Sequence, residues 1–473
     1  MRLDGNGKVE NDLAESYTIE PDNLTYTFSL KKNVKWHDGK DFTADDVVYT
    51  IQTIQNPNFN SPLRSNWKGV RVEKVDDYTI KFILKNVYSQ FLNNLTFGIL
   101  PKHLWGNLGE NNFALAEYNL KAKGTGPFKV KRLTKDKDGK IASIEMIANE
   151  EYYGKKPSIE KLTFELYNDE DSVISAYNRR EIKGINYLSP KNAKRIMDTE
   201  DSNIQRLHLP RYFAVFFNQT KSVPLSDKNV RLALSYATDK NKLVADVLGS
   251  EGTKIDTAIS PGIPGYNQAT KVYDYNVEEA KKILDAAGWI DSDNDGIREK
   301  GDAKISFTLY STDWPEFIET TKMLQAMWKE VGANVEIKSL QVNDLQNGYI
   351  KTRNYEALLF GEVLNYNPDP FSFWHSSQKK DPGLNLALYD NQEADKILEG
   401  IRQEIDPAAR TEKYNRFQDL VADDAPVIFL YSPYYLYVQS NSIKNANLSN
   451  IMTPADRFNS VENWYVTTTR AWK

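Results

Sequence analysis

The chain has 473 residues, of which 40% are hydrophobic and 26% are charged, a composition typical of a folded globular protein. Its 60 basic and 65 acidic residues give a formal net charge of -5 without any block of like charge. This argues against a nucleic-acid partner, because phosphate binding needs a basic surface. The absence of cysteine excludes disulfides, thiolate catalysis and cysteine-ligated metal centres.

Strand and helix patterns alternate along the chain, which predicts an α/β fold. Tyr26, Phe28 and Leu30 alternate with polar residues, as in a half-buried strand. A helix is expected after Thr43, whose hydroxyl can cap it while Asp46 reaches back to the cap. The stretch 124–128, Gly-Thr-Gly-Pro-Phe, lacks the lysine and the following helix of a phosphate-binding loop. It is interpreted as a tight turn before a strand over 128–131.

A βαβ unit is expected between 305 and 340. Apolar residues alternate over 305–309, follow a helical stripe over 314–331 and alternate again from 335 to 337. Gly332 can adopt the left-handed conformation that ends a helix. A helix that connects two neighbouring strands implies that they pair in parallel.

Three further helices and one strand are predicted in the same half of the chain. One helix begins after Asn276, a good N-cap, and ends at Gly288. The other elements are helices over 392–402 and 407–421 and an apolar strand over 427–431.

The loop that begins at Asp291 resembles a calcium loop of the EF-hand type. Such a loop supplies oxygens at its first, third, fifth, seventh and twelfth positions around a hard cation, and Gly296 would allow the sharp turn. The corresponding residues are Asp291, Asp293, Asp295, Ile297 and Asp302. The twelfth residue is Asp rather than Glu and no second helix follows, so an Asx-rich turn without metal is the alternative.

No catalytic constellation stands out. The four histidines, at 37, 103, 208 and 375, are far apart, and none has another histidine at helical spacing, which argues against a histidine-based metal site. The sequence contains no Gly-x-Ser-x-Gly elbow. A binding protein is therefore favoured over an enzyme.

The segment 362–378 is the main candidate for a binding site. It follows a predicted strand over 357–360 and combines two prolines and four aromatic residues with amides and carboxylates. Loops that leave strand ends in open α/β sheets are where ligands bind, and aromatics beside polar groups are typical of solute pockets. A packing loop rich in aromatic residues is the alternative.

Several ordered motifs resemble the family 5 extracellular solute-binding proteins, the large oligopeptide- and dipeptide-binding components of ABC importers. They occupy 13–17, 24–30, 34–39, 42–47, 124–128, 217–220, 230–240, 287–289 and 369–374. The resemblance covers nearly the whole chain. It implies a periplasmic-binding-protein-like fold of type II, in which two α/β lobes joined by hinge strands close around the ligand and a third subdomain is inserted.

The resemblance also implies boundaries. The extra subdomain would span 1–122, lobe I would take 123–220 and 441–473, and lobe II would span 221–440, with hinge strands near Asn218 and Gln439. Family members begin with an export signal and a first strand of lobe I. The start of this chain has no apolar segment of a signal peptide, so we expect a fragment of a protein that works in the periplasm or at the extracellular face of the membrane.

The expected ligand is a peptide, delivered to the permease subunits of an importer by a monomeric carrier. No cofactor is required, and a calcium ion in the loop from Asp291 would be structural. Glu362 is the expected charge partner of the ligand, with Asp369 as the alternative, because the aspartate common in peptide-binding relatives has no counterpart in 365–367. The other expected ligand residues are Asn365, Tyr366, Trp374, His375, Asn385 and Tyr389, and then Phe216 and Asn218 on a hinge strand. The alternatives are an oligosaccharide or a nickel complex in the same fold and, more remotely, a carboxylate-dependent hydrolase.

Overall fold

The computed structural model describes residues 1–4, 8–196, 201–364, 368–446 and 451–467. These residues form two compact units. Unit 1 comprises Met1–Leu188, Asn192–Leu207 and Leu436–Lys473, and unit 2 comprises Ser189–Lys191 and His208–Tyr435.

Unit 1 begins with an antiparallel sheet of order β3-β4-β6-β5, whose apolar face packs on helix α1. As the sequence predicts, Tyr26, Phe28 and Leu30 are buried in β4. The carboxylate of Asp46 accepts a hydrogen bond of 3.0 Å from the Thr43 N–H, so the expected cap is present. The elements are β3 (Ala14–Ile19), β4 (Thr25–Leu30), α1 (Ala44–Gln55), β5 (Arg71–Asp76) and β6 (Thr79–Ile83).

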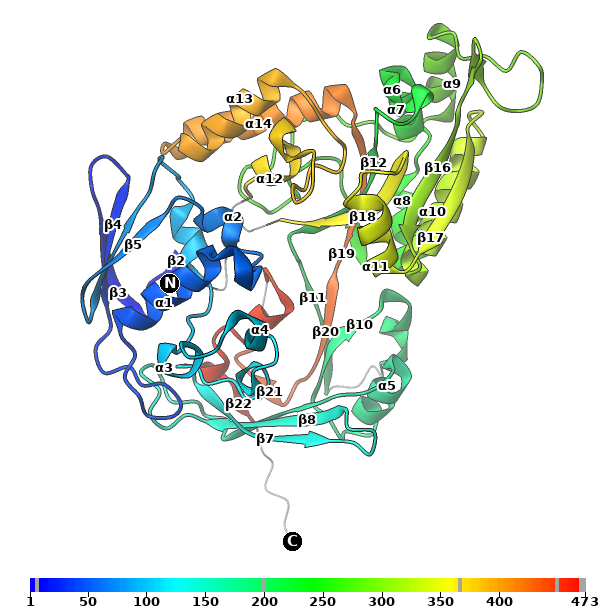
Figure 1. Cartoon of the computed structure of the whole chain (residues 1–473). Coiled ribbons are helices and arrows are strands. Elements are labelled where there is room, and N and C mark those ends of the chain that lie inside the picture. Colours follow the sequence, from blue (N-terminus) through cyan, green and yellow to red (C-terminus); the bar gives the residue numbers. More distant parts are fainter. Residues whose placement is uncertain (5–7, 197–200, 365–367, 447–450, 468–473) are drawn as a thin grey trace. The chain divides into compact units, whose positions relative to one another are not determined.

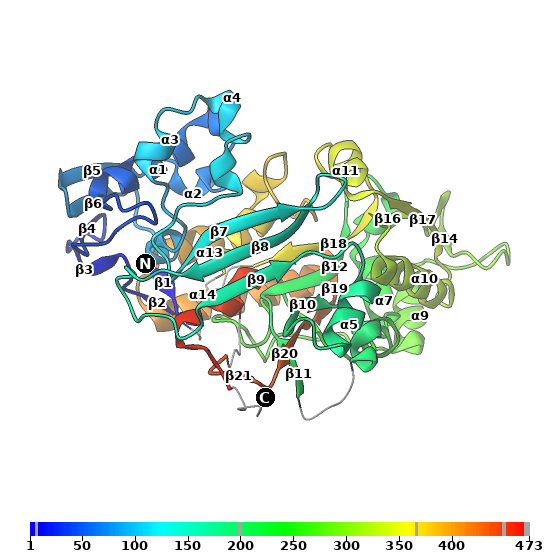
Figure 2. The same cartoon turned by 90° about the horizontal axis from the view of Figure 1, so that it is seen from below.

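The rest of unit 1 contains two three-stranded sheets, of order β7-β8-β9 and β10-β20-β11 (Figure 2). The stretch 124–127 is the expected turn before β7, and His37 holds it: Nδ1 accepts from the Gly124 N–H at 3.1 Å, and Nε2 lies 3.0 Å from the Gly126 carbonyl oxygen. The strands are β7 (Phe128–Lys135), β8 (Ile141–Ala148), β9 (Lys161–Glu165), β10 (Gly184–Leu188), β11 (Ser202–Leu207) and β20 (Tyr435–Ser440).

Short elements complete unit 1. They are β1 (Arg2–Leu3), β2 (Val9–Glu10), α2 (Arg64–Trp67), α3 (Lys102–Trp105), α4 (Glu110–Phe113), α5 (Glu170–Asn178), β21 (Ile443–Lys444) and β22 (Tyr465–Val466).

Unit 2 is built on a six-stranded mixed sheet of order β13-β19-β12-β18-β16-β17. The pairs β16–β17 and β16–β18 are parallel, whereas β12 is antiparallel to both β18 and β19. The strands are β12 (Arg211–Phe217), β13 (Gly252–Lys254), β16 (Ser306–Thr312), β17 (Asn334–Leu340), β18 (Ala357–Val363) and β19 (Val427–Pro433). A small hairpin of β14 (Glu299–Lys300) and β15 (Ala303–Lys304) lies outside this sheet.

Helices cover both faces of this sheet, because alternate residues of its strands belong to different cores. Val215 and Phe217 of β12 belong to one hydrophobic cluster, and Tyr212, Ala214 and Phe216 to another. The first cluster includes α7 (Lys228–Tyr236), α8 (Lys240–Leu248), α9 (Val277–Ala286) and α10 (Pro315–Lys329), and α6 (Val223–Ser226) adds Leu225. The second includes α11 (Val342–Leu345), α12 (Phe371–Trp374), α13 (Gln392–Gln403) and α14 (Pro407–Asp424); α13 and α14 pack side by side (Figure 1).

The predicted βαβ unit is confirmed as β16–α10–β17, with parallel strands and with Gly332 at a φ of 85°. Asn276 caps α9 by accepting from the Glu279 N–H at 3.0 Å. The predicted strand over 357–360 is too short, because β18 continues to Val363, which pairs with Arg211 of β12. Glu362 therefore lies inside a strand rather than at the start of a loop.

Apart from the short stretch Ser189–Lys191, which belongs to unit 2, the chain passes between the units at 207/208 and 435/436, whereas the expected boundaries are 220/221 and 440/441. The first difference arises because β12 pairs along its whole length with β18 and so belongs to the sheet of unit 2. The separate subdomain expected over 1–122 stays a prediction.

Candidate functional site

The carboxyl ends of three parallel strands meet at one edge of the unit 2 sheet. Thr312 of β16 pairs with Leu340 of β17, and β18 lies on the other side of β16 in the same direction. The connection from β16 leads to β17 on one side of the pair β16–β18, and the connection from β18 leads to β19 on the other side, so the two leave in opposite directions. Such a topological switch point is where open α/β sheets bind ligands, so we take this edge as the candidate site.

An exposed tryptophan lies at this edge. Trp314 directly precedes α10, and 49% of its surface is accessible. Its ring packs on Phe317 at a centroid distance of 5.6 Å, and Phe317 in turn contacts Phe213 of β12 edge-on at 4.8 Å. Val363, at the end of β18, is 62% exposed. Trp314 was not among the predicted ligand residues, because its sequence position indicated only the start of a helix; its place just after the end of a strand was the available signal.

Glu362 is buried behind the same edge. The hydroxyl of Tyr212 donates to its Oε2, whereas its Oε1 has no hydrogen-bond partner. Burial raises the pKa of Glu362 to about 8, and the bond from Tyr212 offsets part of this effect. The carboxyl is therefore protonated at neutral pH in this structure, and its role as the charge partner of a ligand stays a prediction.

Two expected ligand residues, Asn365 and Tyr366, lie outside the described residues. Asp369 is engaged by Arg402, whose Nε and Nη2 lie 2.9 Å and 2.6 Å from Oδ2. The same guanidinium lies 3.7 Å from the ring centre of Phe371. Asp369 is therefore held by an internal cation within unit 2.

Trp374, Asn385 and Tyr389 form one buried cluster in unit 2. The indole of Trp374 contacts the ring of Tyr389 at a centroid distance of 6.0 Å. The Asn385 amide donates to the backbone carbonyls of Trp374 and His375, both at 3.2 Å, and to that of Tyr389 at 2.9 Å. The Tyr389 hydroxyl donates to Asp424 at 2.7 Å. These contacts hold the loop after α12 in one conformation, and ligand contact by these three residues stays a prediction.

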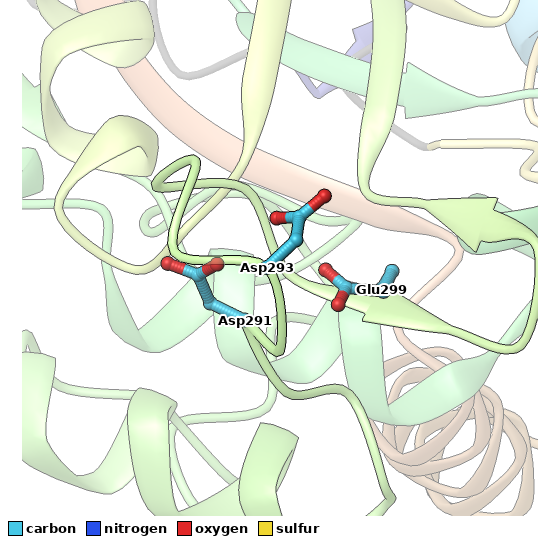
Figure 3. Close-up of side chains that lie close together, drawn as sticks. All are labelled: Asp291, Asp293 and Glu299. Atoms are coloured by element: carbon cyan, nitrogen blue, oxygen red, sulfur yellow. The ribbon is translucent and has the colours of Figure 1, made fainter.

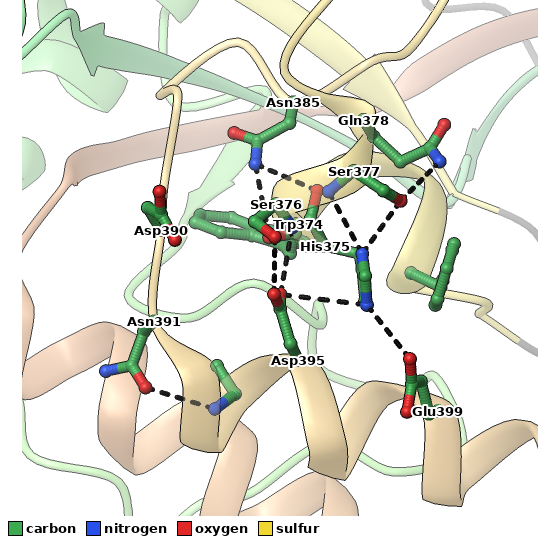
Figure 4. Close-up of polar contacts among 12 residues, drawn as sticks. Trp374, His375, Ser376, Ser377, Gln378, Asn385, Asp390, Asn391, Asp395 and Glu399 are labelled. Carbon is green, nitrogen blue, oxygen red and sulfur yellow. Dashed lines mark hydrogen bonds and ion pairs between the residues drawn. The ribbon is translucent and has the colours of Figure 1, made fainter.

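His375 connects this loop to α13 (Figure 4). Its Nδ1 accepts from the Ser377 N–H at 3.1 Å, so the neutral ring carries its proton on Nε2. Nε2 lies 3.5 Å from Glu399 and 3.9 Å from Asp395, which are one helical turn apart on α13. The ring also stacks on Phe371 at 4.1 Å. The predicted segment thus contacts α13 through the polar groups around His375, while the stacking on Phe371 lies within the segment.

Phe216 and Asn218 lie at the opposite edge of the sheet from Glu362, since Phe217 pairs with Ala357 at the start of β18. Phe216 is part of the second cluster, and the Asn218 amide donates to the Arg353 carbonyl at 3.0 Å. The structure does not bring these two residues to the candidate site.

Each unit also has a cavity of its own. In unit 1 a cavity of 890 Å³ is lined by residues of β9 and β10, each of which is an edge strand of its sheet. In unit 2 a cavity of 760 Å³ is lined by Thr220, Arg353 and Asp390, among others. Both volumes fall in the range of about 300–1,000 Å³ typical of ligand pockets, but neither cavity includes Glu362 or Trp314.

The sequence model of the bacterial extracellular solute-binding proteins, family 5 Middle, matches residues 8–383. The chain belongs to this family. The oligopeptide-binding protein AppA of Bacillus subtilis (strain 168) is 31% identical over 435 residues, which are 90% of this chain and 78% of AppA.

Two solved structures are similar to this chain over nearly its whole length. AppA from Bacillus subtilis in complex with a nonapeptide has a TM-score of 0.81 at 28% identity and covers 99% of this chain and 92% of that chain. NikZ from Campylobacter jejuni in complex with Ni(L-His) has a TM-score of 0.82 at 26% identity, with 98% and 92% covered. The predicted fold class, that of the α/β periplasmic binding proteins, is confirmed.

Membership of family 5 places the chain among proteins that bind small solutes for ABC transporters rather than among enzymes. Within the described parts of the chain, no helix has both the length and the apolar character needed to cross a bilayer. Family membership, and not the lack of such a helix, sets the hydrolase alternative aside.

Proposed function

We propose that this family 5 protein captures peptides outside the cytoplasm and delivers them to the permease subunits of an ABC importer. The observation that carries the proposal is the similarity to AppA, whose solved structure contains a nonapeptide and covers 99% of this chain. The carrier would work as a monomer, because this chain alone matches 92% of the AppA chain that was solved with a nonapeptide.

The chemistry of the candidate site is compatible with a peptide. An extended peptide is held through its main chain, while hydrated pockets accept varied side chains. Trp314 offers a rigid, half-exposed aromatic surface of the kind that packs against such side chains. Glu362, buried beside Tyr212, would be the group that meets a polar end of the ligand, as donor when protonated or as acceptor when ionised.

A metal complex is the second candidate. The similarity to NikZ, solved with Ni(L-His), supports it at almost the same TM-score as for AppA. A small metal complex needs few contacts, whereas a peptide needs a series of main-chain partners, so the two ligands make different demands on the same fold.

Thermal unfolding of the purified chain with defined ligands separates the two candidates. A ligand present at 100 times its Kd stabilises the folded state by about 2.7 kcal/mol. We expect one or more pools of dipeptides, pentapeptides or nonapeptides to raise Tm, and Ni(L-His) to leave it unchanged. A rise in Tm with Ni(L-His) alone would replace the peptide by the metal complex.

A further inference from the structure

The loop between α9 and the β14–β15 hairpin brings three carboxylates together (Figure 3). Asp291, Asp293 and Glu299 each contribute one oxygen to a group in which all the oxygens lie within 4.8 Å of one another. Ile290 and Glu299 close the loop by two backbone hydrogen bonds of 3.0 Å. The carboxylates of Asp291 and Glu299, eight positions apart in the sequence, therefore lie close together, with that of Asp293 beside them.

Two oxygens of this cluster are buried and have no hydrogen-bond partner: Asp291 Oδ1 and Glu299 Oε2. The other oxygen of each carboxylate is already used. Asp291 Oδ2 accepts from the Gly296 N–H at 3.0 Å, and Glu299 Oε1 accepts from the Ser292 N–H at 2.7 Å. A carboxylate oxygen shielded from water without a partner is unfavourable, and a bound cation removes that cost.

We propose that Asp291, Asp293 and Glu299 bind one calcium ion. Ligand oxygens on opposite sides of Ca²⁺ are separated by about 4.6–5.2 Å, since each lies about 2.3–2.6 Å from the ion. The cluster has that size and contains oxygen ligands alone, which suits a hard cation and not a transition metal. Mg²⁺ demands tighter octahedral geometry and keeps its water, so this loop favours Ca²⁺.

The ligand set differs from the one expected from EF-hand spacing. Glu299, at the ninth position of the loop, takes the place expected for Asp302 at the twelfth, because Asp302 lies in the β14–β15 turn outside the cluster. Asp293 Oδ2 also lies 2.9 Å from Nζ of Lys304, and Lys304 pairs with Asp295 as well. Lys304 is thus an internal cation that competes with the ion for Asp293 at the rim of the site. Asp295 pairs with Lys304 and is not among the proposed ligands of the ion.

The site would fix the end of α9 to the edge of unit 2. Arg298, next to Glu299, donates to the Trp289 carbonyl at 2.7 Å, and its N–H donates to the Gly332 carbonyl at 2.9 Å. A loop ordered by the ion would hold Arg298 in place, and Arg298 would in turn hold the segment after α9 and the turn between α10 and β17. The role is structural and does not depend on which solute the protein binds.

Calorimetric titration of the metal-free full chain with CaCl₂ tests the proposal. We expect one Ca²⁺ per chain, a Tm that is higher in CaCl₂ than in EDTA, and at least tenfold weaker binding in Asp291→Asn and in Glu299→Gln. Asp302→Asn is the matched control and should bind as the wild type does. Lys304→Met should bind more tightly, because it removes the competing cation.

Terbium luminescence sensitised by Trp289, which is buried two residues before Asp291, gives a second readout that does not depend on stability. We expect emission that CaCl₂ displaces and that Glu299→Gln lacks. The proposal is overturned if the wild type shows neither heat nor a Tm change at 5 mM CaCl₂ (about the weakest range of protein calcium sites). It is also overturned if Asp302→Asn loses binding while Glu299→Gln keeps it, or if Mg²⁺ binds equally well.

Discussion

The hydroxyl of Tyr212 donates a hydrogen bond to Oε2 of Glu362, and both side chains are buried within unit 2. Tyr212 belongs to β12 and Glu362 to β18, where the two residues are direct partners across the antiparallel pair. The bond therefore joins two central strands just behind the edge at which we place the ligand. Because Oε1 of Glu362 has no partner, ionisation of this carboxyl would leave a buried charge poorly compensated.

We predict that Glu362 makes the protein less stable as pH rises. Burial raises its pKa to about 8, whereas in the unfolded chain it is about 4.3. At pH values between these two pKa values the folded state binds this proton and the unfolded state does not. The free energy of unfolding therefore falls as pH rises through that range. The full effect is at most about 5 kcal/mol, because each pKa unit corresponds to about 1.4 kcal/mol and structural relaxation can only reduce the total.

Urea unfolding at pH 5, 7 and 9 measures this effect. Glu362→Gln should remove most of the decline in the free energy of unfolding with pH, because glutamine has the same shape as glutamate and does not ionise. Glu412→Gln, at an exposed position on α14, is the control and should decline as the wild type does. Parallel curves for the wild type and Glu362→Gln would mean that this carboxyl is already ionised in the folded state.

Trp374→Ala should destabilise unit 2 by about 3–5 kcal/mol, the usual cost of removing a buried large aromatic side chain. The indole is almost fully buried and contacts Phe417 and Phe429 at centroid distances of 5.9 Å and 6.0 Å. Trp374→Phe should recover more than half of that loss. Thermal unfolding of the wild type and the two variants measures this loss. A Tm that is unchanged in the alanine variant would contradict the packing described for Trp374.

Trp314→Ala should act on ligand binding instead. The ring is half exposed, so Tm should change by less than about 3 °C. Loss of its aromatic contact should weaken ligand binding by about 3–10-fold, since such contacts contribute about 0.5–1.5 kcal/mol. Tyr275→Ala is the matched control, because Tyr275 is 47% exposed and lies near Glu330 at the other end of α10. If calorimetry gave Trp314→Ala and Tyr275→Ala the same affinity for the ligand, Trp314 would not be part of the binding surface.

The ion pair of Asp369 and Arg402 should show coupling in a double-mutant cycle. Asp369→Asn and Arg402→Met should each cost about 1–3 kcal/mol, since either change leaves a partly buried charge without its partner. The double variant should cost less than the sum of the two, by at least about 0.5 kcal/mol. Strict additivity in urea unfolding would show that Asp369 is free to meet a ligand.

Much of the fold could be predicted from sequence, because local patterns determined it. The period-two alternation around Phe28, the cap at Asn276 and the glycine at 332 each fix a conformation through nearest neighbours alone. The end of β18 could not be placed in this way. It depends on Arg211, which pairs with Val363 from 152 positions away in the chain.

The candidate site was harder to predict for the same physical reason. Residue type indicated Trp374 and Asn385 as ligand groups. Aromatic and amide side chains, however, pack and form hydrogen bonds within a folded loop as readily as they do with a solute. Whether such a side chain also contacts a solute is set by tertiary packing. Trp314 and Trp374 are the same residue type with opposite exposure, which no local pattern could reveal.

Native mass spectrometry of the full chain, purified without unfolding, detects a bound solute without a prior choice of ligand and so tests whether this protein carries peptides. We expect a 1:1 complex whose added mass, after release and fragmentation, gives amino-acid sequence ions. A released solute that contains nickel or sugar and no peptide, or a chain that remains free of any solute and binds none of the peptide pools, would contradict this expectation.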